Sequence, residues 1–95
     1  MQVHVVRRGG LAGVRLQASV DTRELPPAQA SYAEASLREL PFGRSAAPPS
    51  HPDAFQYEIT LLNDGSDRSV VLDETEVPEG LRPIVDAAVK RGAIV

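Results

Sequence analysis

Two histidines and one nearby carboxylate are the residues of this sequence that most readily suggest chemistry. His51 and Asp53 stand two positions apart in a proline-rich segment, whereas His4 alternates with valines as a strand residue does. A zinc site usually needs about three or four protein ligands, so His51 and Asp53 alone fall short. The chain has no cysteine, which excludes a thiolate metal site, a cysteine nucleophile and a disulfide framework. The sequence therefore predicts no enzyme active site, no metal of its own and no cofactor.

A glycine-rich segment, Gly9-Gly10-Leu11-Ala12-Gly13, is the second candidate site. It superficially resembles a phosphate-binding loop, but no helix follows it and no Lys-Ser/Thr pair completes it. One interpretation is a plain hairpin turn, whose glycines supply positive φ angles. The other is a binding site, because an apolar Leu11 at an exposed tip costs solubility unless a partner covers it. The residues of this segment alone leave both interpretations open.

Alternating apolar residues predict the strands that position these candidates. Residues 2–8 and 14–20 flank the glycine-rich segment and form a hairpin with it, and a second hairpin spans 55–61 and 69–73 around a polar turn at 63–67.

Two helices are predicted, one after each hairpin. Asp21 and Glu24 fit a capping pattern before a helix over residues 28–40, which Pro41 ends. A second helix begins near Pro78 and ends at Gly92. Its buried stripe consists of Leu81, Ile84, Val85 and Ala88. Residues 41–54 contain four of the eight prolines and form a long loop.

The resulting order is β-β-α-β-β-α over a single domain, residues 1–95. We expect an α+β fold in which a four-stranded antiparallel sheet carries both helices on one face, because this arrangement buries every apolar stripe. The first helix would carry the chain to the end of the molecule where residues 9–13 lie. The 41–54 loop and the glycine-rich tip would then share one end, with Asp21 and the 63–67 turn at the other. An apolar tip beside a loop carboxylate suggests a surface for binding another protein.

The composition narrows the class of partner. The 95 residues are 42% hydrophobic and 24% charged, with 10 basic and 13 acidic residues and a net charge of −3. This balance argues against a nucleic-acid partner, which normally requires a basic excess on one face. No apolar run could span a membrane, and the first residues do not resemble a secretory signal. We expect a cytoplasmic protein that is monomeric when free.

Four blocks of the sequence, in this order and spacing, resemble the emfourin-like proteins. They are Arg8-Gly9-Gly10-Leu11-Ala12-Gly13, Val20-Asp21-Thr22 with Leu25-Pro26, Pro52-Asp53-Ala54-Phe55-Gln56-Tyr57, and Val77-Pro78-Glu79-Gly80-Leu81-Arg82-Pro83-Ile84. Emfourin-like proteins are small bacterial inhibitors of protealysin-like metalloproteases of the thermolysin type. This chain departs from the family's Ser-Gly-Gly-Phe-Ala-Gly tip, since Arg8 replaces the serine and Leu11 the phenylalanine.

The resemblance implies a stoichiometric inhibitor that occupies the cleft of such a protease. A thermolysin-type zinc keeps one open coordination position, which a carboxylate from outside can take. We expect Asp53 to supply that carboxylate, with Asp21 as the alternative, and Leu11 to fill the neighbouring substrate pocket. Gly9, Gly10 and Gly13 would let the backbone approach closely, and Ala12, His51 and Phe55 complete the expected contact set. The competing hypothesis is a non-enzymatic adaptor that binds an unrelated protein with the same apolar end.

Overall fold

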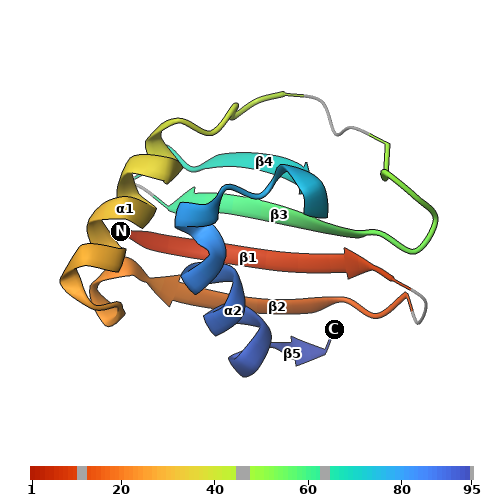
Figure 1. The fold of residues 1–95 in the computed structure, drawn as a ribbon, viewed down its shortest axis with the longest axis horizontal. Helices are drawn as coiled ribbons and strands as arrows, with labels where there is room; N and C mark the ends of the chain where they lie inside the picture. Colours follow the sequence, from red (N-terminus) through yellow and green to blue (C-terminus); the bar gives the residue numbers. More distant parts are fainter. Residues whose placement is uncertain (11–12, 45–47, 63–64, 95) are drawn as a thin grey trace.

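Five antiparallel strands form one sheet in the order β4-β3-β1-β2-β5 (Figure 1). The structure is a computed structural model that describes residues 1–10, 13–44, 48–62 and 65–94. The strands are β1 (Gln2–Gly9), β2 (Leu16–Asp21), β3 (Phe55–Leu62), β4 (Arg68–Asp73) and β5 (Ala93–Ile94). The four predicted strands are confirmed, and the two-residue β5 extends the sheet beyond them by pairing with Leu16 and Gln17. The second strand begins at Leu16 rather than at the predicted position 14.

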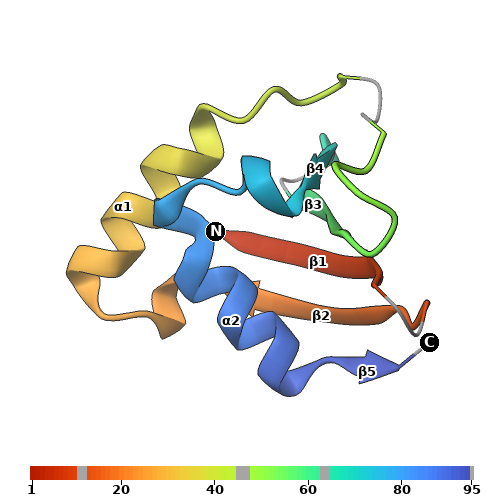
Figure 2. The ribbon, with the colours of Figure 1, turned by 45° about the vertical axis from the view of Figure 1, so that its right-hand side comes forward.

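The helices α1 (Pro27–Arg38) and α2 (Arg82–Arg91) lie on one side of the sheet (Figures 1 and 2). Three single turns of 3-10 helix precede them, η1 (Thr22–Glu24), η2 (Glu74–Glu76) and η3 (Glu79–Leu81). The predicted α+β class and the order β-β-α-β-β-α are therefore confirmed. Pro83 lies in the first turn of α2, where its missing backbone donor is tolerated.

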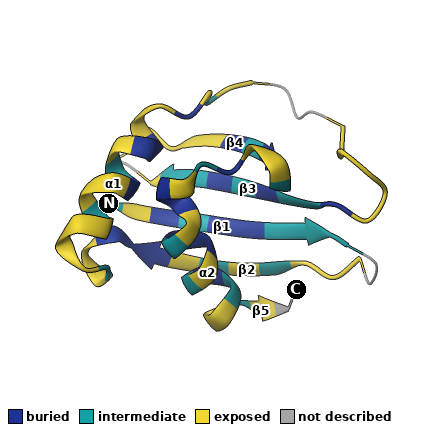
Figure 3. Ribbon diagram, in the orientation of Figure 1, coloured by how far each residue is buried: buried dark blue, intermediate teal, exposed yellow. Residues whose placement is uncertain are grey.

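The core lies between the helices and one face of the sheet (Figure 3). Alternate residues of each strand point toward it, as in Val3 and Val5 of β1, which pair with Leu61 and Ile59 of β3. The largest fully buried side chains are Leu37, Ile59, Leu72, Leu81, Ile84, Val3, Val5, Val20 and Thr22. Burial on one face and exposure on the other explain why the strand pattern was legible in the sequence.

The connection from α1 to β3 follows a different route from the one we expected. The prediction that α1 carries the chain to the tip end is wrong, because α1 stays at the end where β1 begins (Figures 1 and 2). The loop after it runs along the edge strand β4 instead. Gly43 donates to the Ser69 carbonyl over 3.1 Å, and Arg44 Nη2 donates to the Val71 carbonyl over 3.1 Å. This route covers backbone groups at an otherwise open sheet edge and still brings the end of the loop to the tip.

Each hairpin ends in the same capping device. Asp21 closes β2 and forms a capping box with Glu24, and Asp73 closes β4 and forms one with Glu76. The sequence pattern Asp-x-x-Glu, an apolar residue and proline occurs at both places. A hairpin, a 3-10 turn and an α-helix are thus repeated twice, and the two carboxylates end up at opposite ends of the sheet because β2 and β4 run in opposite directions.

Candidate functional site

The glycine-rich tip and the end of the long loop meet at one end of the sheet. Gly9 pairs with Phe55 at the last position of the β1–β3 ladder. Beyond it, the Gly10 backbone N–H donates to the Ala54 carbonyl over 3.3 Å. The two segments that we expected to share one end are therefore in contact through backbone atoms, which fixes the residues beside Ala54 relative to the tip.

The close approach between the two segments requires glycine at positions 9 and 10. Both have positive φ angles, +93° and +77°. A Cβ at Gly9 would lie 2.5 Å from the Ala54 carbonyl oxygen, and one at Gly10 would lie 2.5 Å from the Phe55 ring. Gly13 also has positive φ, +63°, but a Cβ there would meet open space. Contacts inside the molecule thus account for two of the glycines, which we had expected to serve approach to a partner.

The loop segment before β3 is anchored on the cap of β4. Asp73 Oδ1 accepts from the Ser50 N–H over 2.9 Å, and Glu74 Oε1 accepts from the Phe55 N–H over 2.7 Å. His51 Nε2 lies 3.7 Å from the same Glu74 oxygen, and its carbonyl accepts from the Ala54 N–H over 3.0 Å. The expected site residue His51 therefore helps to hold the turn in which it lies.

Asp73 and Glu74 are positioning residues that our sequence analysis missed. The Ser50 N–H, followed by the hydroxyl and N–H of Thr75, lowers the pKa of Asp73 well below its ordinary value. The carboxylate is thus held as an anion that anchors the loop. The signal that could have revealed it is the second copy of the capping pattern that was recognised at Asp21.

Asp53 projects from this anchored turn. The residue is exposed, and its carboxylate has no hydrogen bond or ion pair to any residue that the structure describes. Its neighbour Ala54 is buried and bonded to both His51 and Gly10. A free carboxylate next to a fixed backbone can bind a cation or a donor of a partner without first breaking a contact of its own.

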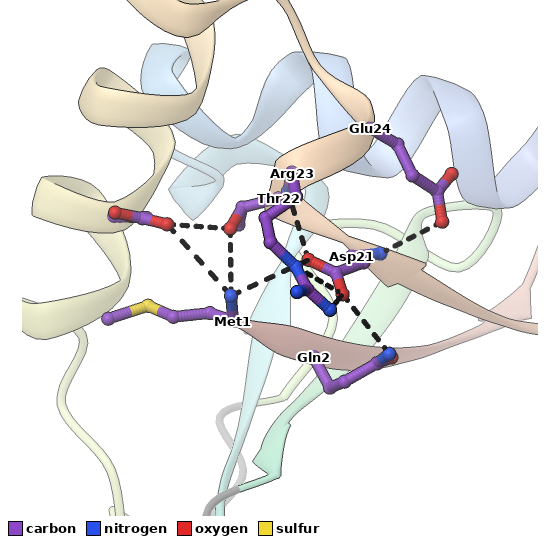
Figure 4. Close-up of polar contacts among 7 residues, drawn as sticks. Met1, Gln2, Asp21, Thr22, Arg23 and Glu24 are labelled. Atoms are coloured by element: carbon purple, nitrogen blue, oxygen red, sulfur yellow. Dashed lines mark hydrogen bonds and ion pairs between the residues drawn. The ribbon is translucent and has the colours of Figure 1, made fainter.

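Asp21 lies at the opposite end of the sheet, where it pairs with Gln2 at the start of β1. Figure 4 shows its polar contacts. Its carboxylate accepts from the side chain and backbone N–H of Arg23 and from Gln2 Nε2, and it lies 3.6 Å from the amino group of Met1. The Arg23 guanidinium, aided by the Arg23 N–H, lowers the pKa of Asp21 well below its ordinary value. Asp21 is buried, at 7% exposed, so it cannot reach a partner without breaking this cluster.

Phe55 is part of the scaffold beneath the tip. The ring is half-buried, lies against Gly10, and has the Arg7 guanidinium over it at 4.3 Å from the ring centre. Leu11 and Ala12, the apolar residues expected at the tip, lie outside the described residues. Gly13 is exposed, and its N–H donates to the Gly10 carbonyl over 3.3 Å.

The described part of the chain contains no group of three or more His, Cys, Asp or Glu residues that could hold a metal ion. No helix within it is long and apolar enough to cross a membrane. What the described residues do present is a small α+β scaffold in which Gly10 is bonded to the loop before β3, with the unpaired carboxylate of Asp53 beside that contact. Such an arrangement is typical of a protein that binds another protein.

The family model Emfourin matches residues 5–88, nearly the whole chain. The chain therefore belongs to the emfourin family. Emfourins are protease inhibitors, which assigns this protein a non-enzymatic inhibitor role and a protease as its partner. No curated protein and no solved structure matches the chain.

Proposed function

We propose that this emfourin inhibits a thermolysin-type zinc metalloprotease of the protealysin kind by occupying its active-site cleft. The tip, residues 9–13, enters the substrate cleft, and Asp53 supplies an anionic oxygen to the open coordination position of the protease zinc. Leu11 fills the adjoining pocket, which normally receives a bulky apolar substrate side chain. The observation that carries the proposal is the backbone contact between Gly10 and Ala54, next to which Asp53 has no partner among the described residues.

The inhibitor blocks the cleft without being cut, because the proposed contacts do not require either segment to present a scissile bond in extended form. Asp53 lies in a tight turn that the His51–Ala54 hydrogen bond closes, and the described glycines of the tip, Gly9, Gly10 and Gly13, have positive φ. The fixed backbone beside Asp53 also loses little conformational freedom on binding, which favours affinity. Zinc binds carboxylate oxygen readily and needs no proton transfer from this chain.

Asp53→Asn tests the zinc-directed carboxylate. The substitution keeps the size of the side chain and removes its charge. The fold should be unaffected because Asp53 is exposed and its carboxylate has no hydrogen bond or ion pair to a described residue. We expect the inhibition constant against a thermolysin-type protease, measured with a quenched peptide substrate, to rise about 100-fold, as losing one charged contact at a desolvated interface does. Glu39→Gln, an exposed residue at the C-cap of α1, is the matched control and should leave inhibition unchanged.

Removing the zinc distinguishes this mechanism from an adaptor role. A zinc-directed inhibitor should bind the metal-free protease much more weakly than the zinc-loaded form, and Asp53→Asn should abolish that difference. Equal affinity for both forms, measured by calorimetry, would favour the adaptor and remove Asp53 from the zinc. An effect of Asp21→Asn on inhibition larger than that of Asp53→Asn would exchange the roles of the two carboxylates.

A further inference from the structure

A groove opens on the helix side of the sheet, between α2 and the strands β1 and β3. Its volume is about 350 Å³. Tyr57, Val85 and Val89 give it an apolar floor, and three cationic side chains and one carboxylate surround it. These charged residues are Arg7, Arg82, Lys90 and Asp86. Figure 1 shows α2 crossing β1 and β2 obliquely, so that neither α1 nor α2 lies over the ends of β1 and β3 next to the tip.

The cations of this groove form no ion pair with a carboxylate that the structure describes, although Arg7 lies over the Phe55 ring. Four of the ten basic side chains form ion pairs with carboxylates in the described part of the chain: Arg8, Arg23, Arg44 and Arg91. Three of the other six, Arg7, Arg82 and Lys90, line the groove and have no ion pair with any described carboxylate. The Nε atom of Arg7 is buried and lacks a hydrogen-bond partner in the described residues. A carboxylate from outside would supply the missing acceptors at this side of the molecule.

The groove is continuous with the candidate inhibitory end. Arg7 lines the groove and also lies over the Phe55 ring, 4.3 Å from its centre. The same ring lies directly against Gly10 of the tip. A partner seated on the tip therefore extends over Arg7 onto α2 without crossing an intervening element.

We infer that this groove binds an acidic segment of the target protease, with Glu or Asp carboxylates at Arg7, Arg82 and Lys90 and a neighbouring apolar side chain against the half-buried Val89. This inference rests on the proposed function, since it places the protease on the tip. The apolar floor and Asp86 suit a peptide better than a polyphosphate backbone, and the net charge of −3 opposes binding of a nucleic acid.

The first test compares two charge-matched double variants in the inhibition assay. Arg82→Ala with Lys90→Ala should raise the inhibition constant at least tenfold and flatten its dependence on sodium chloride concentration. Arg38→Ala with Arg68→Ala removes the same charge from exposed positions away from the groove and should change the constant less than twofold. Equal effects of the two pairs, or no effect of either, would overturn the inference.

The second test needs no protease and so separates this inference from the proposed function. In an NMR titration with the peptide acetyl-Glu-Leu-Glu-amide, we expect shifts confined to the groove residues Arg7, Arg82, Val85, Val89 and Lys90. The shifts should be lost in the Arg82/Lys90 variant. If the protein shows these shifts but does not inhibit the protease, the groove remains an acidic-peptide site and the proposed function is rejected. Inhibition without these shifts, or equal shifts with inorganic phosphate alone, would reject the groove as an acidic-peptide site.

Discussion

The glycines at the tip have two different physical requirements. Gly9 and Gly10 combine positive φ with contacts to Ala54 and Phe55 that leave no room for a Cβ, whereas Gly13 has positive φ alone. The sequence predicted the turn, because clustered glycines are typical of one. It could not distinguish the two kinds of glycine, because the partner of Gly9 and Gly10 lies more than forty residues away in the sequence.

Alanine substitutions at Gly10 and Gly13 should therefore differ. Gly13→Ala should cost about 1–2 kcal/mol of unfolding free energy, the cost of the left-handed conformation for an L-residue. Gly10→Ala adds a clash with the Phe55 ring and should cost more than Gly13→Ala, and it should also weaken inhibition by displacing the tip. Urea unfolding followed by circular dichroism measures the unfolding free energy of each variant. Equal losses for Gly10→Ala and Gly13→Ala would contradict the contact between Gly10 and the Phe55 ring.

At the scale of elements, period-2 and helical patterns predicted the strands and helices because each buries one face. The path of residues 39–54 was not predictable in this way. Proline-rich segments have no period. This one is held by hydrogen bonds to the edge of β4 and to Asp73, and by the ion pair of Arg44 with Glu76. The sequence around Asp53 was enough to predict it as a site residue. The residue that anchors its loop is Asp73, the cap at the end of β4, and no sequence pattern indicated that contact.

The repeated capping device provides a matched pair of variants. Asp21→Asn and Asp73→Asn each replace a buried carboxylate that accepts several hydrogen bonds, so both should lower the urea midpoint. Only Asp73 anchors the loop that carries Asp53, through the Ser50 N–H. We expect Asp73→Asn to raise the inhibition constant, by about tenfold if the loop loosens, and Asp21→Asn to leave it unchanged below the unfolding transition. If Asp73→Asn and Asp21→Asn inhibit equally well, inhibition does not need the hydrogen bond from the Ser50 N–H to Asp73.

At the scale of the whole molecule, the polar contacts have two roles. Some cover the edges of the sheet, and others stabilise the ends of the two hairpins. The β2 edge is covered by β5 and by Arg91, which donates to the Ser19 carbonyl over 3.2 Å, and the β4 edge by the long loop. Covered edges discourage strand-to-strand association between copies. The remaining carboxylate clusters lie at the two hairpin ends, so the stability of both ends depends on the same kind of group.

This arrangement predicts acid sensitivity of the fold. The pKa values of Asp21, Glu24, Asp73 and Glu76 are all lowered in the folded state, by hydrogen bonds from Arg23, Arg91, the Ser50 N–H and Arg44 respectively. The unfolded chain, with ordinary carboxyl pKa values of about 4, binds more protons than the folded protein as the pH falls below about 5. Stability should therefore be fully present at neutral pH and decrease steadily between about pH 5 and pH 2.

Urea unfolding at pH 7, 5, 4 and 3 checks this dependence. The Asp21→Asn, Asp73→Asn double variant should be less stable than the parent at pH 7, and the difference should shrink toward pH 3, because the unfolded parent gains protons at these two carboxyl groups while the folded parent does not. Val70→Ala, at a core position that is 2% exposed, is the control, since a cavity lowers stability by a similar amount at every pH. A difference in stability that stayed constant with pH would mean that the two carboxylates stabilise the fold no more as anions than as neutral groups. We do not expect this outcome, because both carboxylates accept hydrogen bonds in their capping boxes.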